Sequence, residues 1–230
     1  MPNLAFCPCA PVLVPQVAQG AATETAAVLA ACDAAVAALV VSTADGAVLV
    51  VGPGPVEASH DGTCGGTLAG FGVDLTVGGG GPADLPLSLT VGAWLLDRAG
   101  VPQGRRGYLV TAQDGSPLGA EATARLAGAD TVLVMGDGTA CLSDRAPGSL
   151  DPGAAAFDAT VVAALGSGDP ATLAGLDPVE GARLLAAGVP AWRAVGTVLR
   201  DATGGERRWD AKVTAHEAPY GVSYLVATWA

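Results

Sequence analysis

The chain has 230 residues, half of them hydrophobic, and a formal net charge of −11. The apolar content is too high for a disordered coil, and the acidity argues against nucleic acid, whose phosphates require clustered Lys and Arg. The five cysteines are odd in number, and there is neither a secretory-type start nor a run of about 18 apolar residues for a membrane span. These features predict a cytoplasmic protein with reduced thiols.

The first part of the chain alternates short apolar runs with helical patterns. Residues 4–6 predict a first strand, and the prolines of residues 7–15 predict an extended loop without a helix. A helix is expected to begin near Thr23. The β-branched run 47–51 predicts a strand buried on both faces, and it ends in the glycine- and proline-rich sequence 52–55.

The remaining pattern continues this alternation. The expected elements are a glycine-rich segment at 62–81 with a short strand at 73–77, a helix at 87–99, strands at 107–111 and 131–135 with a helix at 118–128 between them, a helix capped by Asp151 with Pro152 as its first residue, helices at 170–176, 178–187 and 190–199, and a strand pair at 207–214 and 221–228. Such alternation predicts a single domain over residues 1–230. Its expected fold is a three-layer α/β/α arrangement around a central, mostly parallel (mixed) sheet.

The loop between the strand at 131–135 and the following helix is the first place to look for function, because ligands of open α/β sheets bind at the carboxyl ends of strands. It contains Gly136-Asp137-Gly138-Thr139-Ala140, then 146–151 (Ala-Pro-Gly-Ser-Leu-Asp), with Phe157-Asp158 in the helix. This segment resembles one in class III extradiol ring-cleavage dioxygenases of the LigB type, a family of catalytic subunits related to the Memo proteins. The resemblance implies a LigB-like fold, an Fe(II) cofactor and a catechol-type aromatic substrate.

The resemblance also implies which residues form the pocket. Cys9 and Pro55 match the two metal-binding histidines, Ala187 matches the third metal ligand, and Ala140 matches an acid/base histidine. Proline and alanine side chains neither bind metal nor transfer protons, and a thiol is a soft ligand poorly suited to a facial-triad iron. We therefore expect a divergent, non-catalytic relative that binds a small aromatic molecule or a partner. The alternatives are an active ring-cleaving oxygenase with an unusual metal site, and a protein that acts only in a homo-oligomer or with a partner subunit.

Two other sites can be assembled from the residues alone. Cys7, Cys9, His60 and Cys64 are candidate soft ligands for zinc, although their spacing is only weakly diagnostic and ordinary reduced thiols are the favoured interpretation. Asp137, His60 and His216 are candidates for a metal-free acid/base site. Against this, His216 fits an exposed polar turn, and Asp137 fits a residue that caps the backbone of its own loop.

Overall fold

A seven-stranded sheet forms the centre of the computed structural model, which describes residues 2–42, 46–204 and 209–230. Its strands follow the order β3 (Ala58–Asp61), β6 (Arg106–Ala112), β2 (Val48–Gly54), β7 (Thr131–Met135), β1 (Asn3–Cys7), β9 (Tyr224–Trp229) and β8 (Ala211–Glu217). The four central strands pair in parallel, whereas β3 and β9 run antiparallel to their inner neighbours and β8 is antiparallel to β9. The mostly parallel, mixed sheet predicted from the sequence is confirmed.

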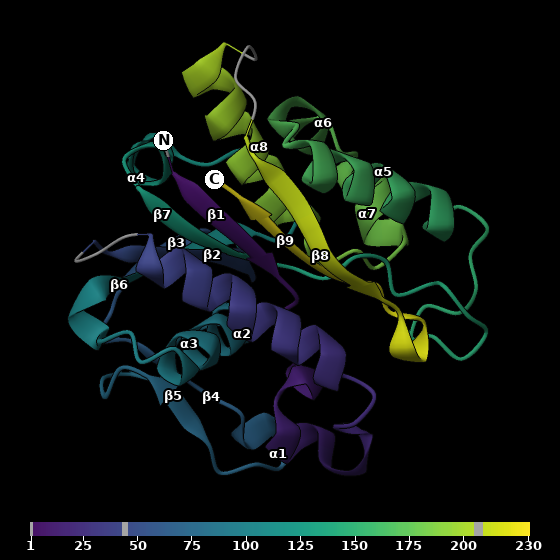
Figure 1. Ribbon diagram of the computed structural model, residues 1–230, viewed down its shortest axis with the longest axis horizontal. Coiled ribbons are helices and arrows are strands. Elements are labelled where there is room, and N and C mark those ends of the chain that lie inside the picture. Colours follow the sequence, from purple (N-terminus) through teal and green to yellow (C-terminus); the bar gives the residue numbers. More distant parts are fainter. Residues whose placement is uncertain (1, 43–45, 205–208) are drawn as a thin grey trace.

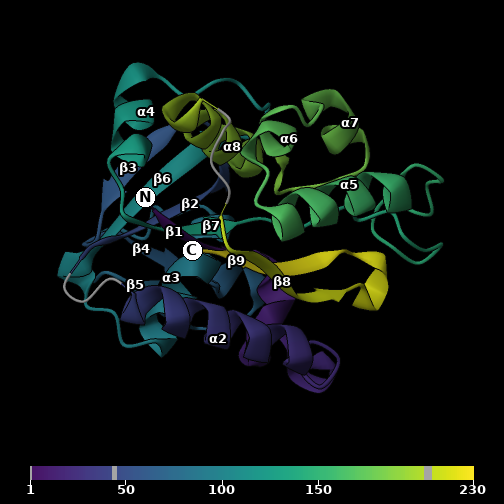
Figure 2. The same cartoon turned by 45° about the horizontal axis from the view of Figure 1, so that its top comes forward.

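Helices cover both faces of this sheet (Figures 1 and 2). Side chains alternate along each strand, so Ala5 and Cys7 of β1 pack on one side and Leu4 and Phe6 on the other. The first side is covered by α2 (Ala26–Val41) and α3 (Leu87–Arg98). The second is covered by α4 (Ala120–Ala127), α5 (Ala154–Ser167), α6 (Pro170–Ala174) and α8 (Val189–Thr203), and α7 (Pro178–Arg183) packs against α8. The three-layer α/β/α arrangement is therefore also confirmed.

The proline-rich loop after β1 differs from the prediction. Pro11 and Pro15 begin two short helices, η1 (Pro11–Leu13) and α1 (Pro15–Ala18). The expectation that these prolines exclude a helix was wrong, because proline is well tolerated at the first helical position, where its missing N–H has no partner to lose. The other short helices are η2 (Gln19–Ala21), η3 (Ala69–Phe71), η4 (Gln103–Arg105) and η5 (Pro219–Gly221).

The glycine-rich segment holds more strand than the sequence pattern indicated. It contains a small antiparallel pair, β4 (Gly65–Thr67) and β5 (Thr76–Gly78), and the edge strand β3 lies just before it. β3 carries the polar sequence Ala-Ser-His-Asp and pairs with β6 on one side. An edge strand with little apolar character leaves no hydrophobic period to detect, which explains why it was missed.

Two further boundaries change the positions of candidate residues. Helix α5 begins at Ala154, not at Pro152, and the Asp151 carboxylate accepts a hydrogen bond from the Gly153 N–H. Strand β8 begins at Ala211, whereas the predicted strand began at residue 207. Residues 207–208 of that prediction lie outside the described residues. β8 extends to Glu217, which places His216 in the sheet opposite Leu225 and not in a turn.

Within the described ranges, no helix is both long enough and apolar enough to cross a membrane.

Candidate ligand-binding pocket

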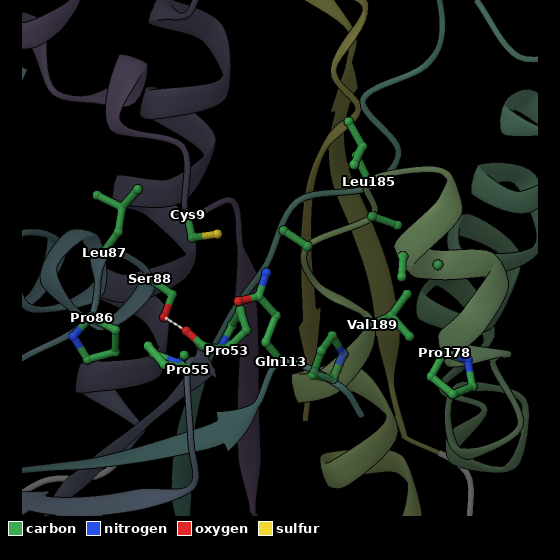
Figure 3. A pocket seen from close by; sticks show the side chains of 16 residues that line it. Cys9, Pro53, Pro55, Pro86, Leu87, Ser88, Gln113, Pro178, Leu185 and Val189 are labelled. Atoms are coloured by element: carbon green, nitrogen blue, oxygen red, sulfur yellow. Dashed lines mark hydrogen bonds between the residues drawn. The ribbon is translucent and has the colours of Figure 1, made fainter. Parts of the chain in front are cut away.

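A cavity of about 630 Å³ lies at the carboxyl ends of the parallel strands (Figure 3). Three strands contribute the residues that follow or end them: Cys9 after β1, Pro53 to Pro55 at the end of β2, and Gln113 after β6. The start of α3 and the region from α7 to the start of α8 supply the rest: Pro86, Leu87, Ser88, Pro178, Gly181, Ala182, Leu185, Ala186, Ala187, Val189 and Pro190. The lining is thus mainly proline and small aliphatic side chains.

One wall is formed where the end of β2 approaches α3. A Cβ atom on Gly52 would lie 2.7 Å from Ser88 Oγ, so glycine is what allows the strand and helix to come this close. The Ser88 hydroxyl donates a hydrogen bond of 2.6 Å to the Pro53 carbonyl. Since Pro53 is part of β2, this bond fixes the wall at the strand end.

The opposite wall is formed where α8 meets the end of β7. A Cβ on Gly136 would lie 2.3 Å from the Cα of Gly188, and the Gly188 N–H donates to the Asp137 carbonyl at 2.8 Å. This glycine–glycine contact brings Ala187 and the first residues of α8 to the cavity. The wall therefore depends on two glycines that do not themselves line it.

The end of α7 shapes the lip of the cavity in an unusual way. The Ala186 N–H donates to the Gly181 carbonyl and the Leu185 N–H to the Ala182 carbonyl, which is the Schellman arrangement of a helix end. Glycine usually occupies the left-handed position of this motif, but here it is Leu185, with φ of 54°. Leu185 is 47% exposed, so burial does not explain why a strained leucine is placed there.

Cys9 is the one titratable side chain among the described residues that line this cavity, and it is paired with Asp137. The Asp137 carboxylate accepts hydrogen bonds from the Cys9 backbone N–H at 2.8 Å and from the Cys9 thiol at 3.5 Å. Burial raises the pKa of Asp137 to about 6, although its hydrogen bonds from Cys9 oppose that shift. Burial and the nearby Asp137 charge raise the pKa of the Cys9 thiol well above its usual value, so this is a protonated, weakly nucleophilic thiol at neutral pH.

Three of the four positions implied by the family resemblance line the cavity, namely Cys9, Pro55 and Ala187. Ala140 does not line it. The Ala140 N–H donates to the Leu184 carbonyl at 3.0 Å, which places Ala140 behind the α7 end. The expectation that Ala140 faces the same cavity is therefore wrong. The backbone hydrogen bond to Leu184 holds this part of the loop away from the cavity lining.

The four residues proposed as soft metal ligands are divided between distant parts of the sheet. The Cys64 thiol lies 3.6 Å from His60 Nδ1, beside the edge strand β3, whereas Cys7 and Cys9 belong to the end of β1. β6, β2 and β7 lie between these strands in the sheet. Among the described residues, no three His, Cys, Asp or Glu side chains are arranged to hold a metal ion.

The proposed acid/base site of Asp137, His60 and His216 is not assembled either. His60 is on β3 and His216 on β8, which are the two opposite edges of the sheet. His216 Nε2 lies 3.2 Å from the hydroxyl of the buried Ser223, and Asp137 contacts Cys9. This combination failed because the sequence alone does not give the order of the strands in the sheet.

The resemblance implies Fe(II), and the residues around the cavity do not fit a two-histidine, one-carboxylate site. The cavity offers one thiol at these positions, and the nearest carboxylate is Asp137, which already accepts hydrogen bonds from Cys9. Neither histidine is among the lining residues. No catalytic step through iron follows from this arrangement.

Sequence reasoning missed Gln113 and Ser88 as lining residues. Gln113 lies two residues after the strand predicted at 107–111, so its place at the carboxyl end of a strand was a usable signal. Ser88 lies in the first turn of α3 and had no comparable signal.

With this geometry described, comparison with known proteins adds no identification. No protein-family model matches the chain, and no match among curated proteins was found.

Proposed function

We propose that this protein is a non-catalytic relative of the LigB-type extradiol dioxygenases that binds a small molecule in the cavity at the strand ends. One observation carries the proposal: a cavity of about 630 Å³ at the carboxyl edge of a parallel sheet, with a lining dominated by proline and aliphatic side chains. Its volume is in the range of small-molecule sites, and its place in the fold is where α/β proteins bind ligands.

The chemistry of the lining favours binding over catalysis. Ring cleavage needs metal ligands and an acid/base group, but Pro55 and Ala187 offer neither, and the raised pKa of Cys9 keeps that thiol protonated. A small apolar ligand, in contrast, would gain from every aliphatic surface that it removes from water. An aromatic ring is a suitable occupant, since proline rings and small side chains form flat walls.

The second candidate is an active ring-cleaving oxygenase with an unusual metal site. The Cys9–Asp137 pair favours it, because a thiolate sulfur and a carboxylate oxygen 3.5 Å apart are two donors that one ion could share. Two protein donors leave a metal weakly held, so we place this candidate second.

Binding is tested with N-phenylnaphthylamine, an uncharged dye whose fluorescence increases in apolar surroundings. We expect saturable, one-site binding to the unmodified chain. In the Ala187→Trp variant the indole would occupy the cavity, and since Ala187 is exposed, the change does not overfill the core. This variant should show no saturable binding of the dye.

The matched control is Ala155→Trp, an equally exposed alanine in α5 that does not line the cavity. It should bind the dye like the unmodified chain. Non-saturable binding, or equal binding by the two tryptophan variants, would contradict the proposal.

The two candidates are separated by metal content and oxygen uptake. Protein loaded anaerobically with ferrous iron and then desalted should retain no stoichiometric iron and consume no oxygen with catechol or protocatechuate. Turnover that is abolished by Cys9→Ser and Asp137→Asn, each compared with Cys141→Ser, would establish the second candidate instead.

Two further expectations remain proposals. All five cysteines are free thiols, which supports a cytoplasmic location with a reducing environment. Self-association is tested by size-exclusion chromatography with light scattering of the purified chain, where a uniform monomer would argue against a homo-oligomer. A partner protein is tested by co-purification from the native host.

A further inference from the structure

We infer that the cavity selects uncharged ligands with an amide-like hydrogen-bonding edge, and that the Gln113 side chain forms the hydrogen bonds to this edge. This inference rests on the proposed function, because it assumes that a small molecule occupies the cavity. It is carried by two observations, namely the absence of charged side chains from the described lining and the state of the three polar side chains that remain.

The first observation concerns charge. The described lining contains no Asp, Glu, Lys, Arg or His side chain. The nearest charge identified is the Asp137 carboxylate behind Cys9, which would repel an anion that entered. A carboxylate in this cavity would give up its water without gaining a cation, which is among the most unfavourable transfers in proteins.

The guanidinium group of Arg193 is directed away from the cavity. Arg193 lies on α8 near Pro178, and its Nη1 donates to the Leu176 carbonyl. It is not among the lining residues, although its Nε is buried without a hydrogen-bond partner in the described structure. If an anion does bind in the cavity, Arg193 is the cation that we would test first as its partner.

The second observation concerns the polar side chains of the lining. The Cys9 thiol donates to Asp137 and the Ser88 hydroxyl donates to the Pro53 carbonyl, so both donors are already used within the protein. Gln113 is different, because it is exposed to solvent at the cavity and its side chain makes no hydrogen bond to the rest of the described chain. Figure 3 shows its carboxamide standing between the two walls of the cavity.

The backbone holds Gln113 in this place. Its N–H donates to the Gly54 carbonyl at 2.9 Å, which ties the residue to the end of β2. A carboxamide presents one acceptor and one donor side by side, so it pairs best with a ligand edge that offers one of each. Primary amides and lactams have such an edge, whereas a carboxylate has acceptors alone.

The test compares two ligands of the same shape, naphthalene carboxamide and naphthalene carboxylate, by calorimetry or by competition with N-phenylnaphthylamine. The unmodified chain should bind the carboxamide at least about 100-fold more tightly than the carboxylate. Gln113→Leu should weaken the carboxamide about tenfold and leave the dye nearly unchanged. Gln16→Leu, in an exposed glutamine of α1 outside the cavity, is the control and should change neither.

A variant that introduces a positive charge makes the test independent of any damage to the fold. Gln113→Lys should reverse the preference, because it places a cation where the lining has none, and the carboxylate should then bind more tightly than the carboxamide. If the unmodified chain binds the carboxylate as well as the carboxamide, the inference is wrong, and loss of that binding in Arg193→Met would identify the reason. In that outcome the dye would still bind, so the proposed function would survive; loss of dye binding itself would refute both.

Discussion

The loop from Gly136 to Gly153 and the lining of the cavity lie side by side but differ in how they are held. The loop is fixed by backbone hydrogen bonds. Two lie within it, from Gly148 N–H to the Ala140 carbonyl and from Asp151 N–H to the Cys141 carbonyl, and two join it to Ser223, from Gly138 N–H to the Ser223 carbonyl and from Ser223 N–H to the Thr139 carbonyl. The cavity is lined by residues with few polar contacts and, at Leu185, by a residue in a strained conformation. The contrast indicates that the loop supports the site and that the lining defines it.

The largest effect is expected at Asp158, a residue of α5 whose side chain holds the loop through Thr139. Its buried carboxylate accepts hydrogen bonds from the Thr139 N–H at 2.9 Å and the Thr139 hydroxyl at 2.7 Å. Asp158→Ala should lower the free energy of unfolding by about 4 kcal/mol, since two bonds to a charged group are lost at about 2 kcal/mol each. Urea unfolding followed by tryptophan fluorescence measures this.

Asp158→Asn keeps one acceptor and should lose about half as much. The exposed Asp144→Ala, in the same loop region, is the control and should change stability by less than about 0.5 kcal/mol. An Asp158→Ala variant as stable as this control would mean that the loop is held by other contacts.

The comparison also explains what could be predicted. The strand β7 and the order of helices and strands followed from apolar periodicity, and the recognisable sequence around Gly136 and Asp158 marked a segment of real structural importance. The cavity lining was harder, because proline, alanine and leucine have no individual signature of binding. Cys9 and Pro55 were indicated by the family resemblance together with their position at strand ends.

What the sequence could not provide was the lateral order of the strands. His60 and His216 are chemically suited to one site, yet β3 and β8 form opposite edges of the sheet. Ala140 was misplaced for a related reason: the path of a loop depends on backbone hydrogen bonds, such as that from Ala140 to Leu184, which side-chain identity does not encode.

The next largest effect is expected at Asp137, where the loop and the cavity meet. Burial raises its pKa from 3.8 to about 6, so the folded protein binds this proton more tightly than the unfolded chain. Below the unfolded pKa, Asp137 is protonated in both states and does not lower the stability of the protein. As pH rises from the unfolded to the folded pKa, the free energy of unfolding falls, and above the folded pKa the loss stays constant. That cost is roughly 3 kcal/mol.

Asp137→Asn removes this ionisation while keeping a side chain of the same shape. Its stability relative to the unmodified chain should improve by roughly 3 kcal/mol between about pH 4 and about pH 7, measured by urea unfolding. Asp144→Asn is the control and should show no such trend. A difference that stays constant with pH would show that Asp137 ionises as easily in the folded protein as in the unfolded one.

A smaller gain in stability is expected at the lip of the cavity. Leu185→Gly should raise the free energy of unfolding by about 1 kcal/mol, because glycine adopts the left-handed conformation of this position without strain. The same variant should bind N-phenylnaphthylamine several-fold more weakly, since it removes part of the apolar lining. Leu150→Gly, at an exposed leucine outside the cavity, should be destabilised and should bind normally. If Leu185→Gly binds the dye more weakly but is not more stable, Leu185 lines the cavity as proposed, but its left-handed backbone conformation is not strained.

The smallest expected effect is on the reactivity of Cys9, which joins the two regions. Burial and the Asp137 charge raise the pKa of its thiol, so iodoacetamide should alkylate it slowly at neutral pH even though it faces a cavity. Asp137→Asn removes the neighbouring charge and should speed the reaction several-fold, while N-phenylnaphthylamine should slow it again by filling the cavity. Peptide mass spectrometry follows each cysteine separately, and the fully buried Cys32 of α2 is the internal control. If the dye protects Cys9 and Cys32 equally, it stabilises the whole fold without covering the thiol. If it protects Cys9 alone, the cavity that Cys9 lines is the one that the dye occupies.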